Sequence, residues 1–491
     1  MSPRLIPYNG SRRMTEPEPT QDNIPNVNIP DSVETIAAIS TPPGRGGIGI
    51  MRLSGPQAAS IAAQLVRLRQ PLEHARARLA DVLDSAPRGE SARIDEALVT
   101  YFAGPNSYTA EDLVEIAAHG SPVVLGLLLN RALELGARLA VPGEFTQRAF
   151  VSGRLDLTQA EAVRDLIEAQ TLTQARQAAS QMGGALSRRV QPVKLALVEL
   201  IALLEAGIDF AEDDVDVTPP VEIARRIDEL LPPLTALEAS FARGRIVHDG
   251  LTLAIVGRPN AGKSSLFNRL VERDRAIVTA TPGTTRDLVT ERISLDGIPL
   301  EMVDTAGLRE GLEEAEQLGI ARSREALADA ALVILVLDAT QPLNEEERGL
   351  LDAIQSRPAL VVLNKCDLMK DANADPDLGL IESLENHGLR PLRTSALTGE
   401  GIAALREEIL ALATGGAASE PGMLTNLRHH QAITAAIQAL NDAAEANTNS
   451  IPHEMILLDL YRALWAFDSL TGQTTSDDIL NLIFSTFCIG K

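Results

Sequence analysis

The sequence predicts a multidomain chain of mixed α/β and α+β class, in which an α/β domain with a mainly parallel sheet interrupts an α-helical domain. After Gly250, apolar runs alternate with helical stretches, an order typical of βαβ units. Ala, Gln, Glu and Leu recur at helical spacing on both sides of that region. Before position 153, short strands and helices mix, which predicts a separate N-terminal α+β domain.

The composition fits several globular domains. Of the 491 residues, 45% are hydrophobic and 23% charged, which excludes a wholly disordered or fibrous chain. The net charge is −23, so contact with nucleic acid needs a local basic patch or a partner protein. Two cysteines are too few for a secreted disulfide framework, so we expect a cytoplasmic location. The apolar runs are shorter than the roughly 18 residues of a membrane span, and no membrane association is expected.

Changes in composition mark the expected domain boundaries. Residues 1–32 are rich in Pro and polar residues without apolar periodicity, so we expect a disordered extension there. The N-terminal domain is expected at 33–152, the helical domain at 153–249 and 416–491, and the α/β domain at 250–415. The two helical segments are assigned to one domain because neither half alone has much to pack against.

Periodicity predicts individual elements within these domains. The strands expected in the N-terminal domain are 36–39, 48–53 and 98–102, and its helices are 56–68 and 122–135. The helices expected in the helical domain lie within 182–206, 221–243, 427–446 and 456–470. The strands expected in the α/β domain are 251–256, 300–303, 331–337 and 359–363.

A phosphate-binding motif opens the α/β domain. Residues 257–264 fit G-x-x-x-x-G-K-S between an apolar strand and a helix, a context that disfavours a glycine-rich turn without a ligand. Backbone N–H groups of such a loop surround phosphates, Lys263 reaches the outer phosphates, and the Ser264 hydroxyl can bind magnesium. The nucleotide-binding residues expected here are Asn260, Ala261, Gly262, Lys263, Ser264 and Ser265.

A second motif predicts which base is bound. Asn364, Lys365 and Asp367 form N-K-x-D directly after the strand at 359–363. A carboxylate at Asp367 can accept hydrogen bonds from the ring and exocyclic N–H groups of guanine, whereas adenine presents an acceptor. The ligand is therefore expected to be GTP. The residues expected to complete the edge of the base site are Ser395 and Ala396.

Two further segments supply the switch elements of a GTPase. Asp304 begins Asp-Thr-Ala-Gly after a strand, where its carboxylate can hold the magnesium shell and the Gly307 N–H can sense the terminal phosphate. Thr285, in Gly-Thr-Thr-Arg-Asp at 283–287, suits the second protein oxygen on magnesium. The nucleotide-binding residues expected from these two motifs are Gly283, Thr284, Thr285, Asp304, Thr305, Ala306 and Gly307.

The residue after Asp-Thr-Ala-Gly departs from Ras-like GTPases, which place a Gln there to orient the attacking water. Leu308 cannot hydrogen-bond water, so another side chain must do so. Glu313, Glu314 and Glu316 lie in the acidic segment that follows. For Glu313 and Glu314, a solvated charged face is the favoured interpretation.

Together these motifs resemble the tRNA-modification GTPases of the MnmE (TrmE) type, over about residues 31–491. The most specific marks are Pro-Pro-Gly-Arg-Gly-Gly at 42–47, Gly-Pro-Asn-Ser-Tyr-Thr at 104–109, Pro-Gly-Glu-Phe at 142–145, Gly-Ile-Asp-Phe at 207–210, Gly-Thr-Thr-Arg-Asp at 283–287 and Phe-Cys-Ile-Gly-Lys at 487–491. The resemblance implies a Ras-like P-loop GTPase domain inserted in the helical domain, an N-terminal domain similar to a folate-binding fold, and a homodimer.

The resemblance also implies activation by potassium, with G domains that dimerise across the nucleotide. An amide oxygen and backbone carbonyls suit this ion, which supplies positive charge where other GTPases use an arginine finger. The residues implied around potassium are Asn260, Thr279, Thr281 and Thr284, and the match adds Ala280 and Pro282 to the GTP-binding residues. The implied catalytic residues are Glu316, which would orient water, Arg286 and Cys488.

The N-terminal domain would, by the same resemblance, hold a tetrahydrofolate one-carbon donor, 5,10-methylene or 5-formyl. The positions that match are Arg52, Glu115, Arg154 and Lys491. The pterin edge offers donors to Glu115, while a cation attracts the glutamyl tail. Arg154 stands where some relatives have Lys, which preserves the charge but not the geometry.

Cys488 has two interpretations: a thiol used in tRNA modification, on a tail folded back onto the helical domain, or a small buried residue that caps a helix. The terminal residues do not fit a prenylation signal. The implied function is the addition, with the flavin-dependent MnmG (GidA) protein in a heterotetramer, of an aminomethyl or carboxymethylaminomethyl group at carbon 5 of the tRNA wobble uridine.

Two alternatives come from other classes of GTPase. A ribosome-assembly GTPase would carry a basic RNA-binding module after the G domain, and residues 416–491 show no such run of charge. A potassium-using transport GTPase would need membrane helices, which the apolar runs are too short to form.

Overall fold

The computed structural model describes residues 34–83, 92–209, 218–271, 291–303, 330–355, 357–369, 384, 390–414, 420, 422–473 and 477–490. They form two compact units, one with residues 34–152 and 477–490 and the other with residues 153–473. The predicted extension at 1–32 lies outside the described residues. Within the described part of the chain, no helix is long and apolar enough to cross a membrane.

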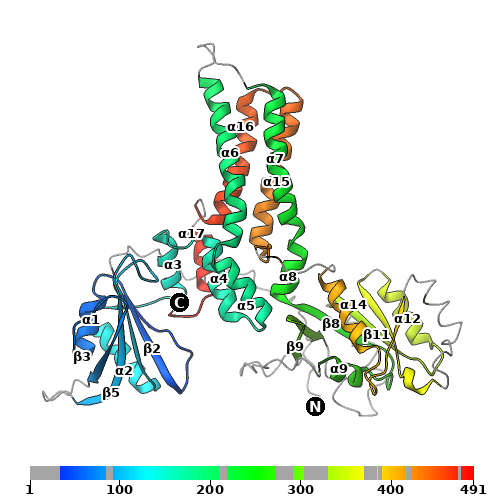
Figure 1. Cartoon of the computed structure of the whole chain (residues 1–491), viewed down its shortest axis with the longest axis horizontal. Coiled ribbons are helices and arrows are strands. Elements are labelled where there is room, and N and C mark those ends of the chain that lie inside the picture. Colours follow the sequence, from blue (N-terminus) through cyan, green and yellow to red (C-terminus); the bar gives the residue numbers. More distant parts are fainter. Residues whose placement is uncertain are drawn as a thin grey trace, which may run out of the picture. The chain divides into compact units, whose positions relative to one another are not determined.

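The first unit is an α+β domain built on one sheet. Its strands are β1 (Ile36–Ile39), β2 (Gly46–Ser54), β3 (Val66–Leu68), β4 (Arg76–Leu83), β5 (Arg93–Phe102), β6 (Leu113–Gly120) and β7 (Arg138–Leu139). They lie in the order β3-β4-β5-β6-β2-β1-β7, antiparallel except for the pair β1 and β7. Helices α1 (Ala58–Leu65) and α2 (Pro122–Glu134) pack against each other and against β2 and β6 (Figure 1).

The helix predicted at 56–68 is wrong at its C-terminal end. α1 ends at Leu65, and the chain continues as strand β3, in which Val66 pairs with Val82 of β4. β-Branched Val66 favours the extended backbone, and pairing with β4 overrides the helical spacing of the apolar residues.

The C-terminal segment belongs to this first unit, whereas the sequence analysis assigned it to the helical domain. Helix α17 (Asp477–Ser485) packs against α3 (Glu144–Val151). Phe484 is buried beside the ring of Phe150 on α3, and the buried ring of Phe487 lies against Phe484. Burial of these aromatic side chains explains why the tail packs on the N-terminal domain.

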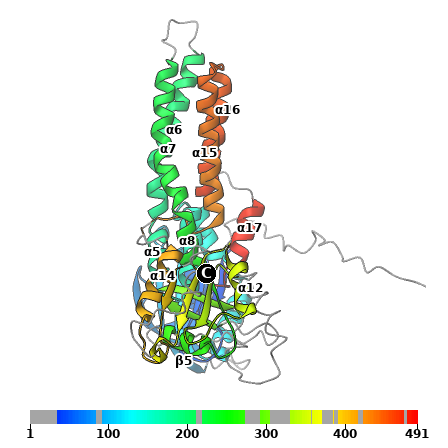
Figure 2. The same ribbon diagram turned by 90° about the vertical axis from the view of Figure 1, so that its right-hand side faces the viewer.

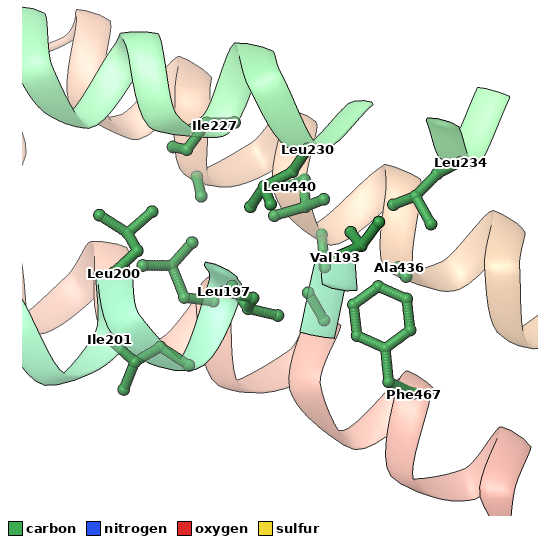
Figure 3. Close-up of a cluster of buried hydrophobic side chains, with 14 of the residues drawn as sticks. Val193, Leu197, Leu200, Ile201, Ile227, Leu230, Leu234, Ala436, Leu440 and Phe467 are labelled. Carbon is green, nitrogen blue, oxygen red and sulfur yellow. The ribbon is translucent and has the colours of Figure 1, made fainter. Parts of the chain in front are cut away.

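The second unit contains a helical bundle whose helices come from distant parts of the sequence. α6 (Ala185–Asp209), α7 (Pro220–Ala239), α15 (Leu427–Thr448) and α16 (His453–Thr471) run side by side (Figures 1 and 2). Leu200 and Ile227 share one buried core with Leu440 and Phe467 (Figure 3). This common core confirms the predicted discontinuous helical domain.

Shorter helices lie at the base of the bundle. They are α4 (Leu157–Glu168), α5 (Leu172–Met182) and α8 (Phe241–Asp249). α4 begins after Asp156 and α5 after Thr171, and each of these N-cap side chains accepts a hydrogen bond from a backbone N–H of the first turn. α8 ends at Asp249 and is capped by Gly250, whose φ of 88° favours glycine, and the chain then enters the α/β domain.

The α/β domain has a sheet of order β13-β12-β11-β8-β10-β9, parallel except for β9. Its strands are β8 (Leu251–Val256), β9 (Glu291–Leu295), β10 (Ile298–Val303), β11 (Leu332–Asp338), β12 (Ala359–Asn364) and β13 (Pro391–Arg393). Its helices are α9 (Lys263–Val271), α12 (Glu345–Ile354) and α14 (Ile402–Thr414), with a 3₁₀ turn, η2 (Cys366–Leu368), after β12.

Both faces of this sheet are buried. Ile334 of β11 packs in a core with side chains of α9 and α14, and its neighbour Leu335 packs in a second core with side chains of α12. Successive side chains of a strand point to opposite faces, so helices cover both sides. The predicted α/β architecture with a mainly parallel sheet is therefore confirmed.

Candidate functional site

The loop between β8 and α9 follows the carboxyl end of a central strand of the parallel sheet. At Gly257 the φ is 141°, and a Cβ would collide with the carbonyl oxygen of Val336 on neighbouring β11. At Gly262 the φ is 94°, and a Cβ would collide with the Asn364 amide. These two glycines let the loop turn sharply beside β11 and β12 before the helix begins at Lys263.

Lys263 holds its ammonium group inside this loop. Its Nζ donates to the carbonyl oxygens of Gly257 at 2.6 Å and Arg258 at 2.9 Å. Burial lowers the pKa of Lys263. Ser264 and Ser265 occupy the first turn of α9, and Asn260 is exposed with a left-handed backbone of φ 62°. The loop therefore combines a cation, hydroxyls and an exposed amide at a helix N-terminus, which suits a phosphate group and its metal ions.

Asn364, at the end of β12, joins the phosphate loop to the predicted base loop. Its buried Nδ2 donates to the Ala261 carbonyl oxygen at 3.0 Å. Its Oδ1 accepts from the Ala396 backbone N–H, also at 3.0 Å. Arg269 of α9 donates to the Ala396 and Leu397 carbonyl oxygens at 3.2 and 2.7 Å, which holds the same loop from the other side.

The carboxylate of Asp367 is exposed and held in orientation. The buried Ser395 Oγ donates to its Oδ1 at 2.6 Å, and Ser395 Oγ itself accepts from the Thr398 N–H at 3.1 Å. An oriented carboxylate at the edge of the sheet can accept two N–H groups of guanine.

Sequence reasoning missed Asp338, which ends β11 and is buried. Its Oδ2 lies 2.8 Å from Nζ of Lys365, whose backbone is left-handed with a φ of 67°. Burial alone would raise the pKa of Asp338, but the hydrogen bonds from Lys365 and Thr340 lower it. Asp338 could have been identified from its position, because it ends a parallel strand beside β12 and ligands bind at the carboxyl ends of such strands.

The first unit brings together Arg52 and Glu115, which face each other across β2 and β6. Nε and one Nη of Arg52 donate to Oε1 of Glu115 at 3.0 and 2.6 Å. The guanidinium lies over the rings of Tyr108 and Phe145, at 5.5 and 5.6 Å from their centres. Its other Nη donates to the Gly490 carbonyl oxygen at 3.4 Å. Arg52 thus positions Glu115, rather than acting as a separate cation.

The C-terminal tail packs beside this pair. The Gly143 N–H donates to the Cys488 carbonyl oxygen at 3.5 Å, while the Cys488 side chain is exposed. The interpretation of Cys488 as a buried residue that caps a helix is therefore wrong, because α17 has already ended at Ser485. Arg154 is exposed and belongs to the second unit.

The other candidate residues lie outside the described residues. They are Thr279, Ala280, Thr281, Pro282, Gly283, Thr284, Thr285, Arg286, Asp304, Thr305, Ala306, Gly307, Glu316 and Lys491.

Comparison with protein families gives two matches that together span both units. The model described as the GTP-binding protein TrmE N-terminus matches residues 35–154, and that of the MnmE helical domain matches residues 157–488. The chain belongs to the MnmE family. Family membership confirms the resemblance inferred from the motifs.

Relatives of MnmE type match almost end to end. The tRNA modification GTPase MnmE of Koribacter versatilis is 57% identical over 93% of this chain and 99% of its own length. The proteins of the same name from Chloroflexus aurantiacus and Pseudomonas aeruginosa are 42% and 41% identical, over 93% and 94% of this chain and 100% and 99% of their own lengths. As a member of the MnmE family, the chain is a GTP-hydrolysing enzyme of tRNA modification, as its motifs predict.

Proposed function

We propose that this MnmE-family chain is a potassium-activated GTPase that acts in the cytoplasm as a homodimer. In a heterotetramer with an MnmG (GidA) type flavoprotein, it takes part in adding an aminomethyl or carboxymethylaminomethyl group at carbon 5 of the tRNA wobble uridine. A tetrahydrofolate derivative, 5,10-methylene or 5-formyl, supplies the carbon. The observation that carries this proposal is the Arg52–Glu115 pair beside the C-terminal tail.

GTP is bound by residues on the loops that follow β8 and β12. Lys263 and the backbone N–H groups of its loop bind the phosphates, and Asp367, oriented by Ser395, accepts the N–H groups of guanine. Asn364 keeps the two loops together, which fixes the distance between phosphates and base. Binding of both ends of the nucleotide orients the terminal phosphate for attack by water.

Two metal ions fit the donors of the G domain. Magnesium would be held by Ser264 and Thr285, and potassium by Asn260, Thr279, Thr281 and Thr284. Ser264 in the first turn of α9 and the exposed amide of Asn260 provide the hard oxygen donors that such ions prefer. When bound there, such cations would supply positive charge against the negative charge that develops on the phosphates. By the family match, Glu316 orients the water, and Arg286 of the motif at 283–287 also acts in catalysis.

The Arg52–Glu115 pair can recognise the pterin part of a folate. Both hydrogen bonds from Arg52 to Glu115 are accepted by Oε1 of Glu115. Among the described residues, Oε2 of Glu115 has no hydrogen-bond partner. Oε2 can therefore accept donors from a pterin edge. A positive charge from Arg154 or Lys491 suits the glutamyl tail. Cys488, exposed on the neighbouring tail, presents its thiol for the modification step.

Calorimetric titration with 5-formyltetrahydrofolate tests this proposal. The wild-type chain should bind the folate, and Glu115→Gln should bind at least about tenfold more weakly because its NH₂ group replaces an acceptor. Glu96→Gln, which changes a partly exposed carboxylate on strand β5 of the same sheet, paired with Arg69, is the control. Absence of folate binding by the wild-type chain would overturn the proposed chemistry.

Cys488→Ser should hydrolyse GTP normally and lose wobble modification. Equal modification by the wild type and Cys488→Ser would show that Cys488 takes no part in the chemistry.

A further inference from the structure

Two neighbouring helices of the bundle expose large apolar side chains to solvent. On α6, Leu195 and Val198 are 53% and 40% exposed, and on α16, Leu458 and Trp465 are 56% and 58% exposed. We call these four residues, together with the ring of Tyr461, the α6–α16 face. Trp465 is the one tryptophan of the chain. Large exposed aromatic and aliphatic groups on adjacent helices mark interaction surfaces more often than isolated exposed residues do.

The two helices run antiparallel along this face. Two polar contacts link them, an ion pair and a hydrogen bond. Lys194 of α6 forms an ion pair with Asp468 of α16 at 2.6 Å, and the Tyr461 hydroxyl donates to Glu205 of α6 at 2.5 Å. Figures 1 and 2 show α6 and α16 side by side along this length.

Helix geometry places Val198 and Trp465 between these two links, and Leu458 about one turn beyond Tyr461. Val198 follows Lys194 by one turn of α6, so it lies on the same side of that helix. Trp465 lies between Tyr461 and Asp468 on α16, with its ring centre 6.3 Å from that of Tyr461. Leu458 precedes Tyr461 by three residues and continues the same surface. The apolar groups therefore lie along one surface of the two paired helices.

The charges around the face are mainly negative. Residues 194–205 of α6 and 454–468 of α16 carry five carboxylates and two cations. Both cations are already paired with carboxylates: Lys194 with Asp468, and Arg462 with Asp459 and Asp442. Glu199 and Glu454 are exposed at its edges. An acidic rim repels RNA and attracts a protein surface rich in Lys and Arg.

We propose that the α6–α16 face binds a protein partner that presents an apolar or aromatic side chain surrounded by Lys and Arg. The inference rests on the proposed function, in which that partner is the flavoprotein. The partner's apolar side chain packs against Trp465 and Leu458, and its cations lie opposite Glu199 and Glu454. A partner with such a surface would also supply the positive charge for tRNA that this acidic chain lacks.

Sedimentation or calorimetric titration of the full-length chain with the purified flavoprotein from the same organism tests the proposal. Trp465→Ala and Leu458→Ala should each weaken binding by at least about 30-fold, as expected for central aromatic and aliphatic contacts. Glu199→Lys with Glu454→Lys should slow association and reverse its dependence on salt. Val221→Ala, which truncates an apolar residue of α7 that is 77% exposed, is the control and should bind as the wild type does. All variants should keep the wild-type rate of GTP hydrolysis without partner, which shows that they fold.

The possible outcomes separate the two proposals. If the wild-type chain binds the flavoprotein and the Trp465 and Leu458 variants bind it equally well, this face is not the docking surface, and the proposed function stands. If the wild-type chain does not bind the flavoprotein at all, the partnership itself is wrong, and the inference falls with it. If Trp465→Ala instead abolishes self-association of the chain or binding of tRNA, a second copy or RNA occupies the face, and the inference is overturned.

Discussion

Nδ2 of Asn364 donates to the carbonyl oxygen of Ala261 at 3.0 Å, so one buried amide at the end of β12 supports the phosphate loop at the end of β8. The same side chain accepts from the N–H of Ala396 in the base loop. One residue therefore links the two loops that are proposed to hold opposite ends of the nucleotide. In the sequence, Asn364 is recognisable only as the first residue of the N-K-x-D motif.

Asn364→Ala should weaken GDP and GTP binding by one to two orders of magnitude. The substitution leaves the Ala261 carbonyl and the Ala396 N–H without their partner, at roughly 1–3 kcal/mol. Fluorescent-nucleotide titration measures the effect. Asn447→Ala removes a comparable amide, which donates to the Pro220 carbonyl oxygen in the bundle. Asn447→Ala should lose stability but keep nucleotide affinity. Equal loss of affinity in Asn364→Ala and Asn447→Ala would indicate that unfolding, and not the lost loop contacts, is the cause.

Asp367→Asn should reduce selectivity for GTP over ATP by about 100-fold, because an amide cannot accept both N–H groups of guanine. Xanthine carries a carbonyl where guanine carries its amino group, so xanthosine nucleotides should bind the variant better than they bind the wild type. Competition binding of GTP, ATP and xanthosine triphosphate measures both shifts. Asp352→Asn on α12 is the control. Unchanged selectivity in Asp367→Asn would contradict the role assigned to this carboxylate.

Gly143→Ala should detach the C-terminal tail from α3. A Cβ at Gly143 would lie 2.6 Å from the Phe484 carbonyl oxygen, so the tail must move. Gly153→Ala is a matched control, since its φ of 72° is nearly the same as the 70° of Gly143 and no atom lies within 4 Å. Both variants carry the backbone strain, roughly 1 kcal/mol. Only Gly143→Ala should increase hydrogen exchange in residues 477–490 and lower wobble modification. Equal effects of both variants would show that strain, not displacement of the tail, is responsible.

Stability should fall between pH 6.5 and 9.5 because of His248 on α8. The Asp165 carboxylate, 3.3 Å from its Nε2, and to a smaller extent the Asp249 carboxylate raise the pKa of His248 from 6.5 to about 9, against the opposing effect of burial. A raised folded-state pKa contributes stability that is complete below pH 6.5 and is lost as the pH rises through about 9, by at most about 3 kcal/mol.

Urea unfolding of wild type and Asp165→Asn across this range measures the effect. The stability difference between the two proteins should shrink as the pH rises, because neutral imidazole gains nothing from the carboxylate. Asp249→Asn, which removes the second carboxylate near His248, should change the pH dependence less. A constant difference between wild type and Asp165→Asn would exclude this ion pair as the cause.

Local signals predicted the domain classes and the central strands of the α/β sheet, but they did not locate β4 and β6 of the first unit. Apolar runs located β8, β11 and β12 to within a residue or two, because strands buried on both faces read as continuous apolar runs. The end of α1 was predicted wrongly, because pairing of Val66 with Val82 depends on a strand elsewhere in the chain. The position of the C-terminal tail was missed for the same reason, since Phe484 has an apolar partner only once α3 is folded.

Motifs located the candidate site but not the contacts that orient it. The phosphate loop and Asp367 stand out because their chemistry requires fixed residue types at fixed spacing. The support from Asp338 to Lys365 spans 27 residues and follows no spacing rule. Arg52 and Glu115 were matched one by one, yet only the register of β2 against β6 shows that they form a single pair.

The rate of GTP hydrolysis in potassium against sodium, at equal ionic strength and without partner, tests the proposed potassium activation most directly. The wild-type chain should hydrolyse GTP at least about tenfold faster in potassium, since the ion supplies the positive charge of an arginine finger. Asn260→Gly, which keeps the left-handed backbone and removes the amide oxygen, should lose this stimulation while still binding GDP. Equal wild-type rates in the two salts would contradict the account.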